Sequence, residues 1–384
     1  MKTRILVASE TGPNGPSRAS GSSDGSNDDT VREAAEALAH GQIVIFPTET
    51  VYGIGANAAD PRAMAELDRL KSRAPDKPYT LHLGGPEEAQ RYAGRLSPLT
   101  TRLIRKAWPG PLALVVPDRR GGNPPCAPLV EEGIYYEGTV GLRCPSHPVG
   151  RAILLAAGVP VAASSANAAG HPPPHEAGQA IAEFDGKVPL IVDAGPTPYA
   201  RPSTVVRIRE DDSYKVLREG AITARRVARL ARTRLLMVCS GNVCRSPMAV
   251  ALAKRMLADR FGCEPEELAD RGIEVASCGT GAVGGLPVTR HAAEALAERN
   301  LDADDHRSRP MTVDALLAAD YIWVMTRGQR DAAAALAREA AGRVSLLDPS
   351  GEEIGDPMGG DVGGYRTCLE RLARAVAQRI EEIA

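Results

Sequence analysis

The chain has 384 residues, of which 43% are hydrophobic and 24% are charged, a composition that excludes a wholly disordered protein and suggests two or three domains. Because 46 Lys and Arg balance 48 Asp and Glu, and only 4% of the residues are aromatic, neither a global basic field nor a base-stacking surface indicates nucleic-acid binding. Seven cysteines without a Cys-x-x-Cys pair, and no apolar run long enough for a membrane span, predict a cytoplasmic protein with reduced thiols and no membrane association.

The first predicted elements are a flexible tail, a helix and a strand. Residues 1–30 are expected to be flexible, because Gly, Ser, Pro and Asn dominate residues 10–29 and large apolar residues are almost absent. Thr30 is a suitable N-cap for the helix that follows, which Gly41 closes. The apolar run at 42–47 then predicts a buried strand.

From there to residue 220, predicted helices and strands alternate. Helices are expected near 63–70 and 151–157, and strands at 79–83, 112–116, 161–163, 190–192, 204–208 and 215–217. The last strands follow one another without a helix, which favours a mixed sheet over a pure βαβ array. Residues 31–220 are therefore predicted to form an α/β domain with a mixed sheet.

An arginine-rich segment at 221–232 separates this part from a second, regular one. We interpret the segment as a basic helical connector with a solvated charged face, a contact with tRNA or phosphate being the alternative. The strands then expected are 235–238, 273–276, 321–325 and 344–347, with helices at 247–261, 288–300, 328–341 and from 362. This alternation predicts a doubly wound parallel sheet over residues 233–384, and no repeat relates the two domains.

The strongest local signal is the run C-S-G-N-V-C-R-S-P at residues 239–247, between a predicted strand and a helix. Inward backbone N–H groups and the helix N-terminus favour a tetrahedral oxyanion there. The same potential favours the thiolate form of Cys239, the expected nucleophile, and Arg245 can hold two phosphate oxygens. Glycine and asparagine tolerate a left-handed turn and a serine can donate to the thiolate, so the expected supports of the loop are Gly241, Asn242 and Ser246.

This segment resembles the low-molecular-weight protein-tyrosine phosphatase family, and the resemblance extends over residues 233–384. The family carries a late Asp-Pro, which Asp356-Pro357 matches. The resemblance implies that Asp356 protonates the leaving oxygen and then activates the hydrolytic water. It also implies a phosphoprotein substrate, a phosphocysteine intermediate, no cofactor, and the catalytic residues Cys239, Arg245 and Asp356.

Departures from the family pattern leave alternatives for the second domain. Met358 and Gly359 stand where many tyrosine-selective members have aromatic residues, and Val243 stands where protein-arginine phosphatases have Thr. Phosphotyrosine is favoured and phosphoarginine is the alternative. Arsenate reductases need a close pair of further cysteines for a thiol relay, and this chain does not show such a pair. The intact set of Cys239, Arg245 and Asp356 argues against a regulator that only binds phosphate. The G-x-G-x-x-G run at 279–284 is interpreted as part of this domain rather than as a nucleotide site.

In the first domain the polar signal is spread along the chain. Hydroxyl, amide and cationic residues recur near the ends of predicted strands, at 47–53, 71–77, 139–143, 164–167 and 203–206. Such groups predict a pocket for a polyphosphate and a small polar ligand. No G-x-x-x-x-G-K-[ST] run occurs, which excludes a Walker-type nucleotide site.

This set resembles the YrdC-like threonylcarbamoyl-AMP synthases over residues 31–220. The resemblance implies that ATP, accompanied by Mg²⁺, reacts with L-threonine and bicarbonate to give threonylcarbamoyl-AMP and pyrophosphate, for t6A at position 37 of tRNA. A threonylcarbamoyl-transferase complex would link the chain to tRNA indirectly. The implied ATP ligands are Arg73, Lys77, Thr139, Asn167 and Arg218. The implied ligands of threonine or its carbamate are Thr50, His82, Arg143, Ser165 and Ser203, and no metal ligand is expected.

Two departures from this second pattern are visible. The run G-H-P-P-P-H-E at 170–176 stands where the family usually has Ser-Pro-Thr, and Pro202 stands where it usually has Glu. A non-catalytic RNA-binding module is the alternative for this domain, against which the charge balance and the sparse aromatics argue. Together the resemblances predict a bifunctional enzyme, a nucleotidyltransferase joined to a protein phosphatase.

Overall fold

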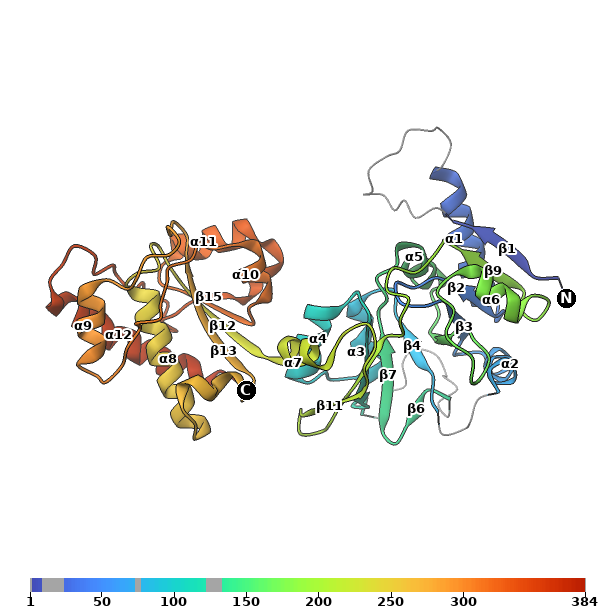
Figure 1. Ribbon diagram of the computed structural model, residues 1–384, viewed down its shortest axis with the longest axis horizontal. Helices are drawn as coiled ribbons and strands as arrows, with labels where there is room; N and C mark the ends of the chain where they lie inside the picture. The colour runs from blue at the N-terminus through green and yellow to red at the C-terminus, as the bar shows by residue number, and fades with distance from the viewer. Residues whose placement is uncertain (1, 9–23, 73–76, 122–132, 384) are drawn as a thin grey trace. The chain divides into compact units, whose positions relative to one another are not determined.

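The chain divides into two compact units, Met1–Leu230 and Ala231–Ala384 (Figure 1). The computed structural model describes residues 2–8, 24–72, 77–121 and 133–383. Within these ranges, none of the helices has the length and the apolar character that crossing a membrane requires. Each unit contains its own sheet and its own buried clusters, and each is described separately below.

A mixed sheet forms the centre of the first unit and contains eleven strands among the described residues. The strands are β1 (Arg4–Val7), β2 (Val44–Phe46), β3 (Gly53–Asn57), β4 (Thr80–His82), β5 (Leu112–Pro117), β6 (Tyr135–Tyr136), β7 (Thr139–Arg143), β8 (Val161–Ser165), β9 (Leu190–Asp193), β10 (Thr204–Ile208) and β11 (Tyr214–Arg218). Their order is β1-β9-β2-β3-β8-β4-β7-β5-β10-β11, and β6 pairs with β7. Parallel pairs such as β4/β7 and antiparallel pairs such as β3/β8 occur together, so the predicted mixed sheet is confirmed.

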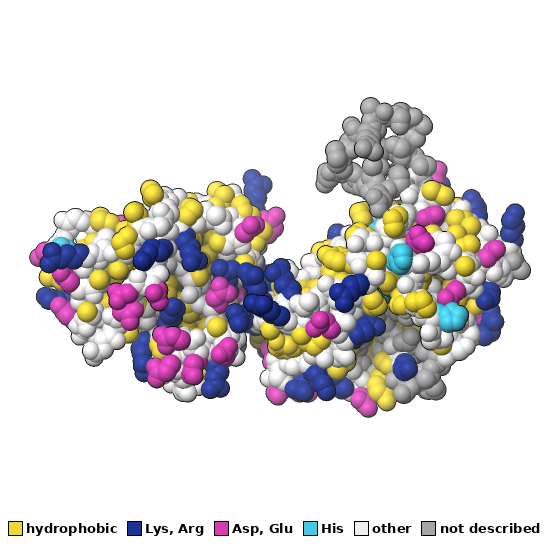
Figure 2. All heavy atoms as spheres, in the orientation of Figure 1, with side chains coloured by type: hydrophobic (Ala, Val, Ile, Leu, Met, Phe, Trp, Pro, Cys, Tyr) yellow, Lys and Arg dark blue, Asp and Glu magenta, His cyan; other side chains and the backbone are white. Residues whose placement is uncertain are grey.

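Helices of the first unit pack against this sheet. They are α1 (Asp24–Ala39), α2 (Pro61–Lys71), α3 (Ala89–Ala93), α4 (Pro98–Ala107), α5 (Pro148–Ala157), α6 (Ala177–Phe184) and α7 (Ala224–Ala231), with a 3-10 turn η1 (Pro86–Glu88). Leu38 of α1 and Ile153 of α5 share a buried cluster with Phe46 of β2. Helix α7 is the basic helix expected over 221–232; it buries Val227 and Leu230, and Figure 2 shows Lys and Arg side chains over it.

The expectation of a flexible tail over residues 1–30 is wrong for two of its parts. Strand β1 pairs in parallel with β9, and Thr3 Oγ1 donates to Val188 O at 2.7 Å. Helix α1 begins at Asp24, before the predicted N-cap. The apolar run of β1 is too short to recognise alone, because β9, which supplies its hydrogen bonds, lies far along the chain. Residues 9–23 lie outside the described part of the chain.

Four parallel strands form the sheet of the second unit, which confirms the predicted parallel sheet. They are β12 (Thr233–Cys239), β13 (Ile273–Gly279), β14 (Tyr321–Val324) and β15 (Val344–Leu346), in the order β13-β12-β14-β15. Strand β13, the next along the chain after β12, pairs with one edge of β12, and the chain then crosses back so that β14 pairs with the other edge. The topological switch point therefore lies between β12 and β14, where open α/β sheets bind their ligands at the carboxyl ends of the strands.

Helices cover both faces of this second sheet (Figure 1). They are α8 (Arg245–Phe261), α9 (Arg290–Ala297), α10 (Val313–Ala318), α11 (Arg327–Leu336) and α12 (Val362–Glu381), with 3-10 turns η3 (Pro265–Ala269) and η4 (Arg338–Arg343). Leu235 and Met237 of β12 pack with residues of α8 and α12, whereas Leu236 and Val238 pack with residues of α10 and α11. This alternation is the period of two expected of a strand buried on both faces.

Candidate active sites

The loop at residues 239–244 joins β12 to α8 at the switch point of the second unit. Cys239 is only 2% exposed. The backbone N–H of Asn242 donates to its Sγ at 3.2 Å, and Ser246 Oγ lies 3.0 Å from the same sulfur. An N–H group and a hydroxyl directed at the sulfur stabilise negative charge on it, which is the arrangement of a nucleophilic thiolate.

Asn242 holds this loop together. Its φ of 56° is left-handed, and its Nδ2 donates to Ser246 Oγ at 2.8 Å and to Ser277 Oγ at 2.9 Å. Its Oδ1 accepts from Arg309 N at 2.8 Å, and its carbonyl oxygen lies 2.7 Å from His306 Nε2, which must be the donor because a carbonyl only accepts. The left-handed turn is therefore fixed by bonds from three other segments.

Glycine is needed at Gly279 rather than at Gly241. The prediction of left-handed backbone at Gly241 is wrong, since its φ lies outside that region. A Cβ on Gly279 would lie 2.4 Å from Ser240 O and 3.0 Å from Asn242 N, so only glycine lets β13 approach the loop. Thr280 N then donates to Cys239 O at 3.0 Å. The G-x-G-x-x-G run at 279–284 thus braces the loop from within the same unit.

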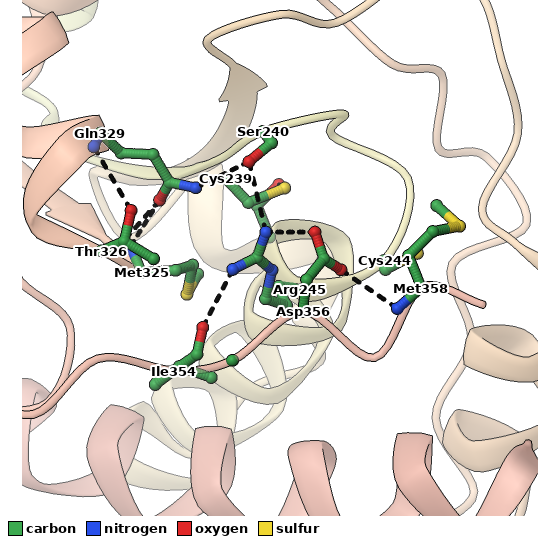
Figure 3. A network of polar contacts seen from close by, with 12 residues as sticks. Cys239, Ser240, Cys244, Arg245, Met325, Thr326, Gln329, Ile354, Asp356 and Met358 are labelled. Carbon is green, nitrogen blue, oxygen red and sulfur yellow. Dashed lines mark hydrogen bonds and ion pairs between the residues drawn. The ribbon is translucent and has the colours of Figure 1, made fainter. Parts of the chain in front are cut away.

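Arg245 and Asp356 meet beside the loop (Figure 3). The Arg245 side chain is 4% exposed; its Nη1 donates to Ile354 O at 2.9 Å, and its Nη2 donates to Ser240 Oγ at 3.3 Å and to the Asp356 carboxylate. Its Nε is buried and has no hydrogen-bond partner within the protein. A buried donor without a partner is costly, and an anion held in the loop would satisfy it.

The other cysteines near the loop are buried thiols. Cys244 Sγ lies 3.3 Å from both Thr289 Oγ1 and Tyr365 OH, and burial raises the pKa of its thiol. Burial also raises the pKa of Cys278 to about 12 and that of Cys368 to about 11. These three groups stay protonated at neutral pH, which argues against a thiol relay.

A cavity of about 540 Å³ lies over one face of the first unit's sheet. Side chains along its wall recur at two-residue intervals, as side chains on one face of a sheet do: Thr80 and His82, Ala113 and Val115, Ala163 and Ser165, and Ser203, Val205 and Arg207. Its cationic side chains are Lys77, Arg143, Arg207 and Arg218, whereas Glu137 is the acidic one among the described lining residues. The cavity therefore favours an anionic ligand.

Arg143 is the most buried cation of this cavity. Its Nη2 donates to Glu49 Oε1 at 2.9 Å and to Thr50 Oγ1 at 2.7 Å, and Glu49 Oε2 also accepts from Ser146 N at 3.0 Å. Its Nε is buried without a partner in the protein. Thr50, predicted to contact threonine, is fully buried and does not line the cavity, so it lies behind Arg143. Glu49 was not predicted, although it lies within the same motif.

His82 is a neutral side chain on the cavity wall. Burial, helped by the charge of Arg143, lowers its pKa to about 3. Its Nδ1 lies 3.1 Å from Thr80 O, and because a carbonyl only accepts, Nδ1 carries the hydrogen and Nε2 is an acceptor. The ring meets Phe46 edge-on, with centroids 6.2 Å apart. His82 can therefore accept a hydrogen bond from a ligand in the cavity.

Arg218 and Ser203 form a second polar group on the wall. Arg218 Nη2 donates to Ser203 O at 2.8 Å, and burial together with the charge of Arg143 lowers the pKa of its guanidinium. The charge of Arg143 thus lowers the pKa of both Arg218 and His82. Two more predicted ligands, Lys77 and Thr139, line the same cavity.

Asn167 organises a loop at the edge of the cavity and does not line it. Its Nδ2 donates to the carbonyl oxygens of Ala168 and His171, both at 2.8 Å, and its Oδ1 accepts from Ser165 Oγ at 2.5 Å. Lys71, which belongs to the polar run at 71–77 but was not predicted as a ligand, donates through its Nζ to Ser165 O at 2.7 Å and to Asn167 O. Arg73, the remaining predicted ligand, lies outside the described residues.

Comparison with known proteins gives a match for each unit. Residues 36–220 match the family described as "Telomere recombination", whose model covers the YrdC domain, and residues 234–384 match "Low molecular weight phosphotyrosine protein phosphatase". A solved structure similar to the second unit is the YwlE arginine phosphatase from Geobacillus stearothermophilus, at 30% identity, covering 39% of this chain and 92% of that chain with a TM-score of 0.35.

Relatives of the first unit are threonylcarbamoyl-AMP synthases. That of Bacillus subtilis is 35% identical over 201 residues, covering 52% of this chain and 56% of that protein. That of Chromohalobacter salexigens is 34% identical over 187 residues, covering 49% of this chain and 97% of that protein. Both resemblances found in the sequence are thereby confirmed: the chain belongs to the YrdC-like threonylcarbamoyl-AMP synthases through its first unit, and its second unit matches the low-molecular-weight phosphotyrosine protein phosphatase family.

Proposed function

We propose that the chain is a bifunctional enzyme, an L-threonylcarbamoyladenylate synthase and a cysteine-dependent protein phosphatase. The observation that carries the synthase is the cationic cavity, in which buried Arg143 stands beside neutral His82. The observation that carries the phosphatase is the meeting of Arg245 and Asp356 at the loop that holds Cys239.

In the synthase reaction, the threonine amine attacks bicarbonate and water is lost. An oxygen of the resulting carbamate attacks the α-phosphorus of ATP, and pyrophosphate leaves. Arg143 binds the threonine carboxylate through its unpartnered Nε, and His82 Nε2 accepts from the threonine. Lys77 and Arg218 hold the phosphates and stabilise the charge that develops on pyrophosphate.

The other predicted residues take supporting places in this proposal. Ser165, Ser203 and Thr139 offer hydroxyl groups at the cavity, and Arg73 is proposed as a further phosphate ligand. Thr50 orients Arg143, and Asn167 shapes the loop that carries Ser165. These assignments divide the site into groups that touch the ligand and groups that hold them.

Mg²⁺ enters this reaction with the substrate. The acidic side chain among the described lining residues, Glu137, lies 3.7 Å from Arg207, so the wall suits phosphates better than a bare cation. ATP would bring Mg²⁺ on its own phosphates. The threonylcarbamoyl-AMP would pass to a transferase complex that modifies position 37 of tRNA. Both this destination and the reduced thiols expected from the sequence support a cytoplasmic location.

In the phosphatase reaction, Cys239 Sγ attacks the phosphorus while Arg245 and the loop N–H groups hold the phosphoryl oxygens. Asp356 in its protonated form gives its proton to the leaving oxygen, the P–O bond breaks and the S–P bond forms. Asp356 then takes a proton from water, which attacks the phosphocysteine and releases phosphate and the thiolate. Phosphotyrosine is the favoured substrate, because the second unit matches the phosphotyrosine phosphatase family and Met358 can still offer an apolar contact to an aromatic ring in place of the usual aromatic residues. Met358 is 53% exposed, and its backbone N–H donates to Asp356 Oδ1 at 3.2 Å.

Two assays on the full chain test this proposal. Pyrophosphate release from ATP should require both threonine and bicarbonate, and Arg143→Ala should abolish it while leaving phosphatase activity intact. Phosphate release from a phosphotyrosine peptide should exceed that from a phosphoarginine peptide, and Cys239→Ser should abolish it while leaving the synthase intact. Pyrophosphate release that ignores threonine, or phosphatase turnover that survives Cys239→Ser, would refute the corresponding half.

A further inference from the structure

A glutamine from a distant helix is bonded to the phosphate loop. Gln329, 5% exposed, stands in the first turn of α11, which follows β14. Its Oε1 accepts from Met325 N at 2.9 Å and from Thr326 N at 3.2 Å. Because both of these partners are donors, the atom facing them must be the amide oxygen, and the NH₂ group faces the loop.

That NH₂ group donates to Ser240, the residue directly after the nucleophile (Figure 3). Gln329 Nε2 lies 3.1 Å from Ser240 Oγ, and Arg245 Nη2 donates to the same oxygen at 3.3 Å. A hydroxyl oxygen has two lone pairs and one hydrogen, and neither an amide NH₂ nor a guanidinium can accept. The O–H of Ser240 must therefore donate to a third group.

We infer that Gln329 is a positioning residue of the phosphatase, which orients Ser240 so that its hydroxyl donates to a phosphoryl oxygen bound beside Cys239. The inference rests on the phosphatase function proposed above. A preoriented donor is most valuable where charge develops in the transition state, because no reorganisation is needed at that moment. The same contact steadies Arg245, which shares the Ser240 oxygen.

Helix capping alone does not account for a glutamine here. Thr326 and Gln329 form a capping box, in which the residue at the third helical position only has to accept from the backbone. Glutamate accepts equally well in that place. Glutamine is required only where the other atom of the side chain must donate, and here that atom meets Ser240.

The test compares four variants of the full chain. Gln329→Met and Ser240→Ala each remove one side of the contact, and the double variant measures their coupling. Thr326→Ala is the matched control, because Thr326 Oγ1 accepts from Gln329 N at 3.3 Å and caps the same helix, while no bond joins it to Ser240. For each variant, kcat and KM on p-nitrophenyl phosphate, inhibition by inorganic phosphate, and the melting temperature are measured.

We expect Gln329→Met and Ser240→Ala each to lower kcat/KM by about three- to tenfold, the usual worth of one hydrogen bond, and to weaken inhibition by phosphate by a similar factor. The loss of kcat/KM in the double variant should be no larger than the loss in the more impaired of the two single variants. Thr326→Ala should melt at a lower temperature and keep the kinetic constants of the wild type. If Gln329→Met does not fold, Gln329→Glu keeps the cap, and we expect it to show the kinetic losses at an unchanged melting temperature.

Two results would overturn the inference: a kinetic loss in Thr326→Ala equal to that in Gln329→Met, or a Gln329 effect that persists undiminished in the Ser240→Ala background. Failure of the proposed function is a separate outcome, seen as a wild-type chain without cysteine-dependent turnover. Calorimetric titration of inorganic phosphate into the same variants then still tests the contact, since binding needs no turnover. If all four variants bind phosphate with the affinity of the wild type, the inferred role of Gln329 is refuted.

Discussion

Asp356 carries a prediction at the scale of a single residue. Its side chain is 41% exposed and forms an ion pair with Arg245, which is compatible with the proposed role of general acid. We expect Asp356→Asn to lower kcat on a phosphotyrosine peptide by roughly 10² to 10⁴, the usual worth of a general acid. The loss on p-nitrophenyl phosphate should be smaller, because that leaving group needs little protonation. Equal losses on the two substrates would point to a structural role instead.

His82 makes the stability of the first unit depend on pH. Its pKa is about 3 in the folded chain, whereas a histidine in an unfolded chain has a pKa near 6.5. Between these values the unfolded state binds the extra proton, so the free energy of unfolding falls as the pH falls. His82→Asn keeps a nitrogen that can donate to Thr80 O and removes the titrating group. Melting curves at about pH 7 and about pH 4.5 should show a larger drop for the wild type than for His82→Asn, and equal drops would contradict this account.

Residues of the phosphate loop could be predicted because they are close in sequence. Cys239, Asn242 and Ser246 lie within eight positions, and one strand–loop–helix pattern places them all. The cavity of the first unit draws on many strands, and a strand-end motif does not tell which side chains face the ligand. Thr50 therefore turned out to lie behind Arg143. Gln329 could not be found from the sequence, because only the tertiary fold brings α11 to the loop.

At the scale of elements, the close approach of β13 to the phosphate loop predicts the effect of a single methyl group. We expect Gly279→Ala to push Ser240 O away and to lower phosphatase kcat/KM by roughly 10²-fold, since a shift of about 1 Å at a catalytic loop costs that much. Gly281→Ala is the matched control, because a Cβ there meets nothing within 4 Å. Similar activities of the two variants would show that the loop tolerates the shift.

Elements with a clear local pattern could be predicted, whereas helix α10 could not. The strand and helix around the phosphate loop, β12 and α8, were expected within two residues of their observed bounds. Helix α10 spans six residues and was not expected, because it is too short to show a helical period. The predicted helix at 328–341 is α11 followed by the 3-10 turn η4.

The whole molecule is predicted to be divisible without loss of either chemistry. Each unit contains buried clusters of its own, and the chain passes from one unit to the other between Leu230 and Ala231. We expect Met1–Leu230 and Ala231–Ala384, expressed separately, to melt cooperatively and to keep synthase and phosphatase activity respectively. Deleting residues 1–8 should destabilise only the first fragment, because it removes β1. An insoluble fragment, or activity restored only by mixing, would contradict this division.

The pairing of β1 with β9 also sets an order of events during synthesis of the chain. Arg4 is made 186 positions before its partner Leu190. At about 5 to 20 residues per second, β1 waits roughly 10 to 40 s before its neighbour leaves the ribosome. This edge of the first sheet thus stays open until β9 has been made, whereas β10 and β11, which complete the opposite edge, are made later still. The nascent strand β1 needs protection from other chains until β9 reaches it.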